Sequence, residues 1–180
     1  MDSGIISMRY AKALLRLATE RHEDERVYAE MHTLAASFTA CPTLLQALLN
    51  PVASAQRKQR LLTAAACADK EPTESTRRFL RLVVSKGRVE AMQLIALAYC
   101  TAYEQAHRIV NARLVVPATV SDDIIARLRA EIEQRTEGDI RFTQTVDPDI
   151  IGGYILEYAS YRRDASLRTQ LNRLRRQLAK

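Results

Sequence analysis

The sequence predicts an α+β protein of two domains: a six-helix N-terminal bundle over residues 1–110, and a small α/β domain over residues 111–180 with a short sheet and two helices. Only five of the 180 residues are glycine and five are proline, while alanine, leucine and arginine are abundant, a composition that favours helix. Apolar residues recur at steps of three and four as far as about residue 109, and from Asn111 they alternate instead. This change of period places the expected domain boundary near residue 110.

The first predicted helix, from about Ile5 to Thr19, is apolar around more of its circumference than packing on one side requires. Its two neighbouring apolar stripes consist of Met8, Ala11, Leu15 and Ala18, and of Tyr10, Ala13, Leu14 and Leu17. The apolar arc spans roughly 200°, about twice what a helix packed on one side needs. Such a helix either lies deep in a bundle or offers its second stripe to a partner, and the residues alone favour burial.

Five further helices complete the predicted bundle. They are expected at Asp24–Thr39, at Pro42–Leu49, after a cap at Ser54, at Thr73–Ser85 and at Arg88–Ile109. Pro42 fits the first turn of a helix, and the Ser54 hydroxyl can accept a hydrogen bond from a free backbone N–H at a helix start. The fifth helix has Phe79, Leu80, Val83 and Val84 as its apolar residues, with Gly87 to end it.

The second domain is predicted from alternating segments between turn signals. Strands are expected at Asn111–Val116, Ile140–Val146 and Tyr154–Tyr158, with a possible fourth at Tyr161–Arg163. A helix between the first two strands is expected to begin at Ser121, to turn Ile125, Leu128 and Ile132 inward, and to end at Gly138. Asp147-Pro148 and Gly152-Gly153 predict turns before the third strand.

The last predicted helix, from Leu167 to Lys180, has leucines on one face and can be capped by Asp164 or Ser166. Residues 162–180 contain six arginines and one lysine against one aspartate, so they account for the whole net charge of +6. Such a tail could contact nucleic acid, anionic lipid or an acidic protein, or stay solvated while its cations complement the helix dipole. Among the binding alternatives, an acidic or mixed-charge protein helix is favoured.

The sequence indicates no catalytic, cofactor-binding or metal-binding group. Its three histidines are solitary, and Gly152-Gly153 lacks the Gly-x-Gly-x-x-Gly pattern of a phosphate-binding loop. Asp147 and Asp149 flank a proline, which indicates a cap and a turn in preference to a carboxylate pair for acid–base catalysis. The cysteines, Cys41, Cys67 and Cys100, match no metal spacing, so reduced thiols in a cytosolic protein are expected.

Membrane and nucleic-acid classes are also disfavoured. No apolar run approaches the roughly eighteen residues that span a bilayer, so no direct membrane insertion is expected. No nucleic-acid-binding motif is present, and the aromatic residues nearest the basic tail, Tyr158 and Tyr161, precede it. An enzyme and a nucleic-acid adaptor are therefore weaker alternatives than a protein-binding function.

Four segments, in order along the chain, carry a resemblance to one family. They are Arg9-Tyr10-Ala11-Lys12-Ala13-Leu14, Leu49-Asn50-Pro51 followed by Lys58, the run from Phe79-Leu80 to Gly87-Arg88, and Val146-Asp147-Pro148 with Gly152-Gly153 and Asp164-Ala165-Ser166-Leu167. Together they resemble the δ subunit of bacterial F-type ATP synthases, whose mitochondrial counterpart is the oligomycin-sensitivity-conferring protein. The chain departs from the family at Ala159-Ser160, where Gly-Asp is usual, and at Ala165, where glycine is usual.

The resemblance implies a non-catalytic peripheral-stalk (stator) subunit with no cofactor and no metal. In the family, this subunit links the catalytic α/β head to the b subunits and resists rotor torque during proton-driven ATP synthesis. It is one copy within the complex, held peripherally at the cytoplasmic face of the bacterial cell membrane.

The resemblance also implies two contact surfaces. A groove between the first and fifth helices is expected to take the N-terminal helix of an α subunit, and this use of the second stripe reverses the preference for its burial. The groove residues implied are Tyr10, Ala13, Leu14, Leu17, Leu80, Val83 and Val84. The C-terminal ends of the b subunits are expected on the last helix, at Leu167, Leu171, Leu174, Arg175 and Leu178.

Overall fold

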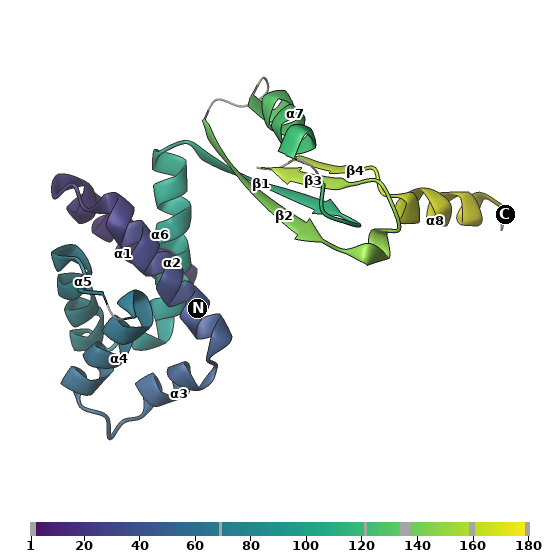
Figure 1. The fold of residues 1–180 in the computed structure, drawn as a ribbon. Coiled ribbons are helices and arrows are strands. Elements are labelled where there is room, and N and C mark those ends of the chain that lie inside the picture. Colours follow the sequence, from purple (N-terminus) through teal and green to yellow (C-terminus); the bar gives the residue numbers. More distant parts are fainter. Residues whose placement is uncertain (1–2, 69, 121, 134–137, 159–160, 179–180) are drawn as a thin grey trace. The chain divides into compact units, whose positions relative to one another are not determined.

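The computed structural model describes residues 3–68, 70–120, 122–133, 138–158 and 161–178 (Figure 1). The chain divides into two compact units, Met1–Gln105 and Ala106–Lys180. The first unit is helical and the second combines a sheet with helices, so the predicted order of a helical part and a small α/β part is confirmed. The second unit begins at Ala106, whereas the change of hydrophobic period suggested residue 111.

The helices of the first unit follow one another through short connections. They are α1 (Ser3–Glu20), α2 (Asp24–Ala40), α3 (Thr43–Leu49), α4 (Ala55–Cys67), α5 (Glu74–Ser85), the 3₁₀ helix η1 (Val89–Ala91) and α6 (Met92–Ala106). The predicted cap at Ser54 is confirmed, because its side chain accepts from the Arg57 N–H at 3.3 Å. Gly87 follows α5 with φ of 65°, the conformation expected of a residue that ends a helix.

The sixth helix is shorter than predicted at both ends. Residues 89–91 form the 3₁₀ turn η1, so α6 begins at Met92, and it ends at Ala106. Arg108 has φ of 53°, which lies outside the helical range, so the helix does not continue past this residue. Ile109 and Val110 then pair with β2. The prediction was wrong here because β-branched residues fit the spacing of a helix but gain more from a pleated strand.

The core of the first unit is built from large apolar side chains of all its main helices. The largest of those fully buried are Tyr99, Leu14, Met31, Leu34, Leu48, Leu62, Leu80, Met92, Ile95 and Val27. On α1 the buried line is Ser7, Ala11, Leu14 and Ala18. This line combines residues of both predicted stripes: Met8 of the first stripe is 37% exposed, and α1 is turned so that Leu14 of the second packs inward.

The second unit is a four-stranded sheet with one helix packed on it. Its elements are β1 (Ile109–Val116), α7 (Asp122–Glu133), β2 (Asp139–Val146), the 3₁₀ helix η2 (Pro148–Ile150), β3 (Ile155–Tyr158), β4 (Tyr161–Asp164) and α8 (Leu167–Leu178). The strand order is β2-β1-β3-β4; β1 and β2 are parallel, and the other pairs are antiparallel. The parallel pair requires a crossover, which α7 supplies.

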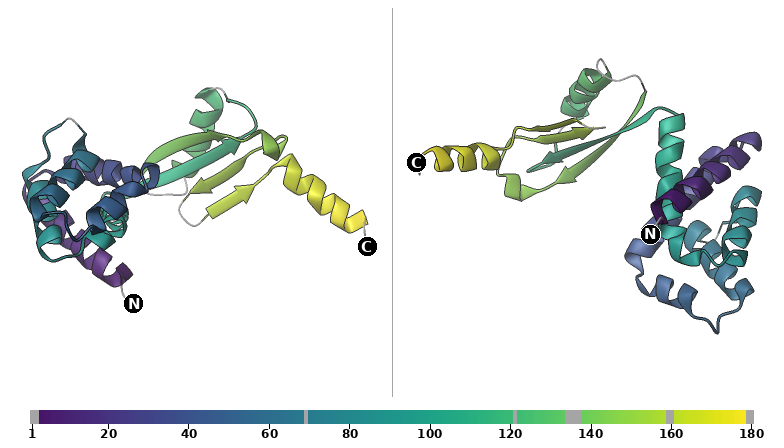
Figure 2. Two further views of the ribbon diagram at one scale, coloured as in Figure 1. Left: turned by 90° about the horizontal axis from the view of Figure 1, so that it is seen from below. Right: turned by 180° about the vertical axis from the view of Figure 1, so that it is seen from behind.

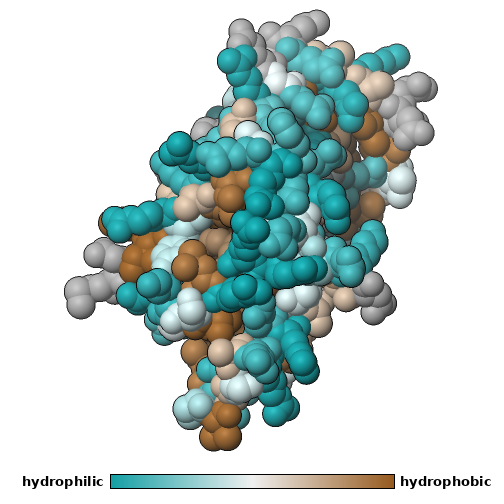
Figure 3. Space-filling view, turned by 90° about the vertical axis from the view of Figure 1, so that its left-hand side faces the viewer, coloured by the Kyte–Doolittle hydropathy of each residue, from teal (hydrophilic) through white to brown (hydrophobic). Residues whose placement is uncertain are grey.

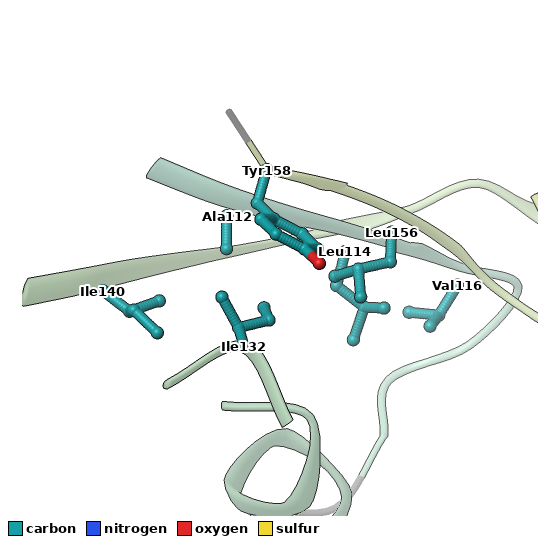
Figure 4. Packing of buried hydrophobic residues seen from close by; sticks show 7 residues of the cluster. All are labelled: Ala112, Leu114, Val116, Ile132, Ile140, Leu156 and Tyr158. Carbon is teal, nitrogen blue, oxygen red and sulfur yellow. The ribbon is translucent and has the colours of Figure 1, made fainter. Parts of the chain in front are cut away.

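The core of this unit lies between α7 and one face of the sheet. Figure 4 shows Ile132 of α7 pointing toward strand side chains that converge from β1, β2 and β3. The buried cluster consists of Ala112, Leu114, Val116, Ile132, Ile140, Leu156 and Tyr158. The alternation in β1 and β2 places these side chains on the same face. The predicted inward residues Ile125 and Leu128 are partly buried, and Ile132 is fully buried.

The last helix, α8, extends away from the sheet in each view of Figures 1 and 2. Both candidate caps at its start contribute. The Ser166 hydroxyl accepts from the Thr169 N–H, and the Asp164 carboxylate accepts from the Ser166 N–H and hydroxyl. The Ser166 hydroxyl holds the pKa of Asp164 below its ordinary value. The expected cap Ser121, the turn Ala159-Ser160 and the terminal Lys180 lie outside the described residues.

Gly153 occupies a position that only glycine fits. Its φ is +76°, and a Cβ placed on it would lie 2.1 Å from the Ala165 carbonyl oxygen. We expect Gly153→Ala to lower the free energy of unfolding by roughly 2 kcal/mol or more, because φ above zero and a backbone clash both oppose a side chain. Urea denaturation followed by circular dichroism measures this.

The matched control is Gly4→Ala, since a Cβ on Gly4 meets nothing within 4 Å. Gly4 lies in α1, where alanine is the better helix former, so this variant should be as stable as the parent or slightly more so. Equal stability of the two variants would contradict the tight fit at Gly153.

Candidate functional site

A largely apolar groove lies between α1 and α5 on the first unit. Its volume is about 500 Å³, in the range of pockets that bind ligands or peptides. Its apolar lining consists of Tyr10, Ala13, Leu14 and Leu17 from α1 with Phe79 and Leu82 from α5, and its cations are Arg9, Arg78 and Lys86. Figure 3 views the side on which α5 lies and shows brown apolar surface bordered by teal hydrophilic side chains.

The floor and the walls of this groove are made by different side chains. Leu14 is 1% exposed and belongs to the core as well as to the floor. Tyr10 meets Phe79 edge to face, with ring centroids 6.3 Å apart, so the two aromatic rings join the helices across the groove. Leu82 is 45% exposed, which leaves an apolar wall open to solvent.

The position of α5 is fixed by carboxylates from the helix beside it. The buried Glu30 carboxylate on α2 accepts from the Thr73 N–H and from the Thr73 hydroxyl, both at 2.8 Å. Thr73 caps α5, because its hydroxyl oxygen in turn accepts from the Thr76 N–H. Glu30 therefore accepts hydrogen bonds from donors at the positive, N-terminal end of α5, and the same donors satisfy its buried carboxylate.

A second carboxylate holds the first turn of α5. Glu23, just before α2, accepts from the N–H and the hydroxyl of Ser75. The Ser75 hydroxyl holds the pKa of Glu23 below its ordinary value, so this contact strengthens the fold above that value and is lost only as pH falls through the lowered pKa. Because Glu23 follows α1 closely, the end of α1 is brought to the start of α5, and the two helices run alongside each other in opposite directions.

The structure places the residues predicted for this groove in two different ways. All four from α1, namely Tyr10, Ala13, Leu14 and Leu17, line the groove. On α5, Leu80 and Val83 are fully buried inside the unit, and Val84 is half-buried outside the groove lining, so the expected α5 face was wrong.

The α5 side of the groove is made by Arg78, Phe79, Leu82 and Lys86. Sequence reasoning missed Leu82 because Phe79, Leu80, Val83 and Val84 form an adequate apolar face by themselves. The signal that could have found it is the spacing 78–82–86, which puts one leucine between two cations along a single edge of the helix.

The charge around the groove is positive. Arg9, Arg78 and Lys86 line it, and no carboxylate is among its described lining residues. Arg78 also bonds to Glu74 on its own helix, with Nε to Oε1 at 2.7 Å, and both side chains are solvated. An apolar floor with cations along its edges fits an amphipathic helix that carries carboxylates beside its apolar face.

A second exposed apolar surface lies on α8. Leu167, Leu171 and Leu174 are 44%, 53% and 55% exposed, and Arg175 beside them is exposed too. The side chain of Leu178, also predicted here, lies outside the description. In Figures 1 and 2 the α8 ribbon extends beyond the sheet and does not run alongside α7.

Asp147, one of the two aspartates considered for acid–base chemistry, has a structural role. The Asp147 side chain accepts from the Asp149 N–H at 3.0 Å and caps η2, so the predicted cap and turn is confirmed.

Among the residues that the structure describes, no three His, Cys, Asp or Glu side chains are grouped so as to hold a metal ion. Within the same ranges, none of the helices has both the length and the apolar character needed to cross a membrane.

Comparisons with known proteins point to one family over almost the whole length of the chain. The family described as ATP synthase delta (OSCP) subunit matches residues 6–178. The ATP synthase subunit delta of Phocaeicola vulgatus is 37% identical over 177 residues, covering 98% of this chain and 95% of the relative. That of Parabacteroides distasonis is 39% identical over 175 residues, covering 97% and 96%.

A similar fold occurs in the cryo-EM structure of the Toxoplasma gondii mitochondrial ATP synthase hexamer. One chain there superposes with a TM-score of 0.67 and covers 97% of both chains. The sequence identity is 21%, so this likeness concerns the fold alone.

The contact between Glu30 and Thr73 should matter for stability. We expect Glu30→Ala to lower the free energy of unfolding by about 2 kcal/mol, because the Thr73 N–H would be left buried without its acceptor. Glu25→Ala, an exposed change on the same helix, should alter it by no more than about 0.5 kcal/mol. Chemical denaturation of both variants checks this, and equal effects would show that α5 is held by other contacts.

Proposed function

Because the chain belongs to the ATP synthase delta (OSCP) subunit family, we propose that it is a non-catalytic peripheral-stalk subunit of an F-type ATP synthase. It joins the catalytic α/β head to the b subunits and resists rotor torque during proton-driven ATP synthesis. In this proposal α1–α6 act as the family's six-helix domain and grip the head, while the second unit, the C-terminal domain, grips the stalk. The subunit is present as one copy, bound peripherally at the cytoplasmic face of the bacterial membrane.

The observation that carries this proposal is the open apolar groove between α1 and α5. A groove of about 500 Å³ whose wall includes a 45% exposed leucine leaves apolar surface that a partner can remove from water. An amphipathic helix laid into an apolar groove is a common way to bind, with contacts repeating at steps of three and four. The proposed occupant is the N-terminal helix of an α subunit.

The residues assigned to this contact follow from the groove lining. They are Tyr10, Ala13, Leu14, Leu17, Phe79 and Leu82, with Phe79 and Leu82 in place of the Leu80, Val83 and Val84 expected from the sequence. Ala13 is exposed between larger side chains, and its single methyl group allows the backbone of a bound helix to come close.

The proposed contact with the b subunits is the leucine face of α8. Leu167, Leu171 and Leu174 are all exposed, and the helix bears arginines with no carboxylate in its sequence. A b-subunit helix with an apolar stripe and acidic flanks complements this surface. Leu178 and Arg175 extend the same assignment toward the end of the chain.

The proposed action is mechanical. A stator must stay bound while the rotor pulls on the head, so the quantity that matters is the rate at which each contact dissociates. Buried apolar anchors mainly slow dissociation, whereas charges at the edge mainly speed association. The apolar floor and the cationic edge of the groove suit these two tasks.

A pull-down from detergent-solubilised membranes tests the function as a whole. The tagged chain, expressed in its own organism, should co-purify the α, β and b subunits of the ATP synthase. Recovery of the chain without any of them, at matched expression, would overturn the proposal. Nucleic acid recovered in their place would favour the nucleic-acid alternative.

Leu82 tests the groove residue by residue. We expect Leu82→Ala to weaken the binding of a synthetic peptide from the α-subunit N-terminus by about tenfold, because an apolar contact worth roughly 1–2 kcal/mol is lost. Leu94→Ala on α6 is a closely matched control, since Leu94 is 47% exposed and Leu82 45% exposed. Calorimetric titration measures both, and an equal loss for Leu94→Ala would argue against the groove.

Lys86 tests the cationic edge. We expect Lys86→Glu to weaken binding of the same peptide roughly fivefold at low ionic strength, with the difference shrinking as salt is raised. Arg81→Glu makes the same charge change on α5 at an exposed residue outside the groove lining. A salt-independent loss, or the same loss for both variants, would contradict an electrostatic role for Lys86.

A further inference from the structure

The turn after η2 places an isoleucine in a backbone conformation that β-branched residues rarely adopt. Ile151 has φ of 66° and ψ of −41°, and the Gly152 N–H donates to the Ile150 carbonyl oxygen at 2.8 Å. This is the γ-turn with positive φ, which is rare and strained for any L residue. A branched Cβ makes the strain larger, because it crowds the backbone on both sides.

Contacts on both sides hold the turn in this conformation. Before it, the Ile151 N–H donates to the Pro148 carbonyl oxygen at 3.0 Å. After it, the Gly152 carbonyl oxygen accepts from the Leu167 N–H at 2.9 Å. Leu167 also covers Gly152 so closely that a Cβ there would lie 2.6 Å from Leu167 Cδ1. The turn is therefore clamped between η2 and the start of α8.

The side chain of Ile151 does little inside its own unit to offset this strain. It is 61% exposed, so most of its apolar surface stays in water. A glycine or an asparagine would adopt the same backbone conformation with less strain and would expose no apolar surface. Strained residues that the fold does not itself require are found at sites that contact other molecules.

Ile151 directly precedes Gly152, which is in contact with Leu167 at the start of α8. Leu167 begins the row of exposed leucines that continues with Leu171 and Leu174. Around this row α8 carries Arg168, Arg173, Arg175 and Arg176, with no carboxylate in the helix. The apolar surface available to a partner thus begins at the turn, before the helix itself.

We propose that the strained turn presents Ile151 as an anchor at the base of the α8 leucine row, and that both together bind one acidic, amphipathic helix. This rests on the proposed function and deepens it, because the occupant to which we commit is the C-terminal helical segment of a b subunit. The positive charge of α8 selects carboxylates on the flanks of that helix, and Ile151 and the leucines bury its apolar stripe. The strain is thus retained for binding and not for the stability of the free protein.

The test exploits the opposite effects expected on folding and binding. In the full-length chain, Ile151→Gly should raise the unfolding temperature of the second unit, or leave it unchanged, because glycine accepts positive φ. The same change should weaken binding to a purified soluble b-subunit fragment, without its membrane segment, by about tenfold. Scanning calorimetry and surface plasmon resonance give the two readouts.

Two further variants make the outcome decisive. Ile151→Leu keeps an apolar side chain and should bind within about threefold of the parent, a difference of roughly 0.7 kcal/mol. Val52→Gly removes another β-branched side chain, 90% exposed in the first unit, and should leave binding unchanged. Weaker binding by Ile151→Gly with both controls intact supports the proposal.

Three results would overturn it. Unchanged binding by Ile151→Gly shows that Ile151 is no anchor, while the stalk function stands. Weaker binding accompanied by a lower unfolding temperature shows that Ile151 serves the fold. Absence of binding by the parent chain removes the b-subunit contact itself, and with it both this inference and that part of the proposed function.

Discussion

The groove on the first unit depends on the hydrogen bonds that two carboxylates make with the start of α5. Glu30 and Glu23 come from α2 and the residue just before it, and they accept from Thr73 and Ser75. A buried carboxylate is tolerated only where donors satisfy it, and a helix N-terminus supplies such donors together with a favourable dipole. These contacts fix where α5 starts beside α1, and the groove is the space that this placement leaves open.

Much of the fold could be predicted from local signals. The Ser54 cap, the Asp147 turn and the alternation in β1 and β2 each depend on residues within a few positions of one another. What could not be predicted depends on distant contacts. The end of α6 at Ala106 is decided by the pairing of Ile109 and Val110 with β2, thirty residues further along the chain.

The candidate site, too, could be predicted from the sequence only in part. The apolar width of α1 allows either burial or an accessible stripe, and the residues alone favour burial. Tyr10, Ala13 and Leu17 nevertheless line the groove, as the family resemblance implied. On α5, however, four apolar residues can face inward in more than one way. The rotation that buries Leu80 and Val83 and leaves Leu82 at the groove is set by packing against the other helices. Periodicity alone identifies an amphipathic helix but does not fix its rotation to within one residue.

Each unit thus leaves apolar surface uncovered: the groove on one, and the row of Leu167, Leu171 and Leu174 with the turn at Ile151 on the other. Neither surface offers a nucleophile or an acid–base pair, and both are bordered by cations. Such surfaces are suited to holding helices, and in the proposed b-subunit contact the strain at Ile151 is stability given up for binding. In the proposed stalk, binding at both surfaces is what resists the torque.

A cryo-EM map of the assembled ATP synthase that contains this chain would show whether the groove holds a helix of the α subunit. We expect helical density in the α1–α5 groove, in contact with Tyr10, Phe79 and Leu82 and continuous with the N-terminus of an α subunit. A well-ordered first unit whose groove is empty, or is filled by a segment of another kind, would contradict it.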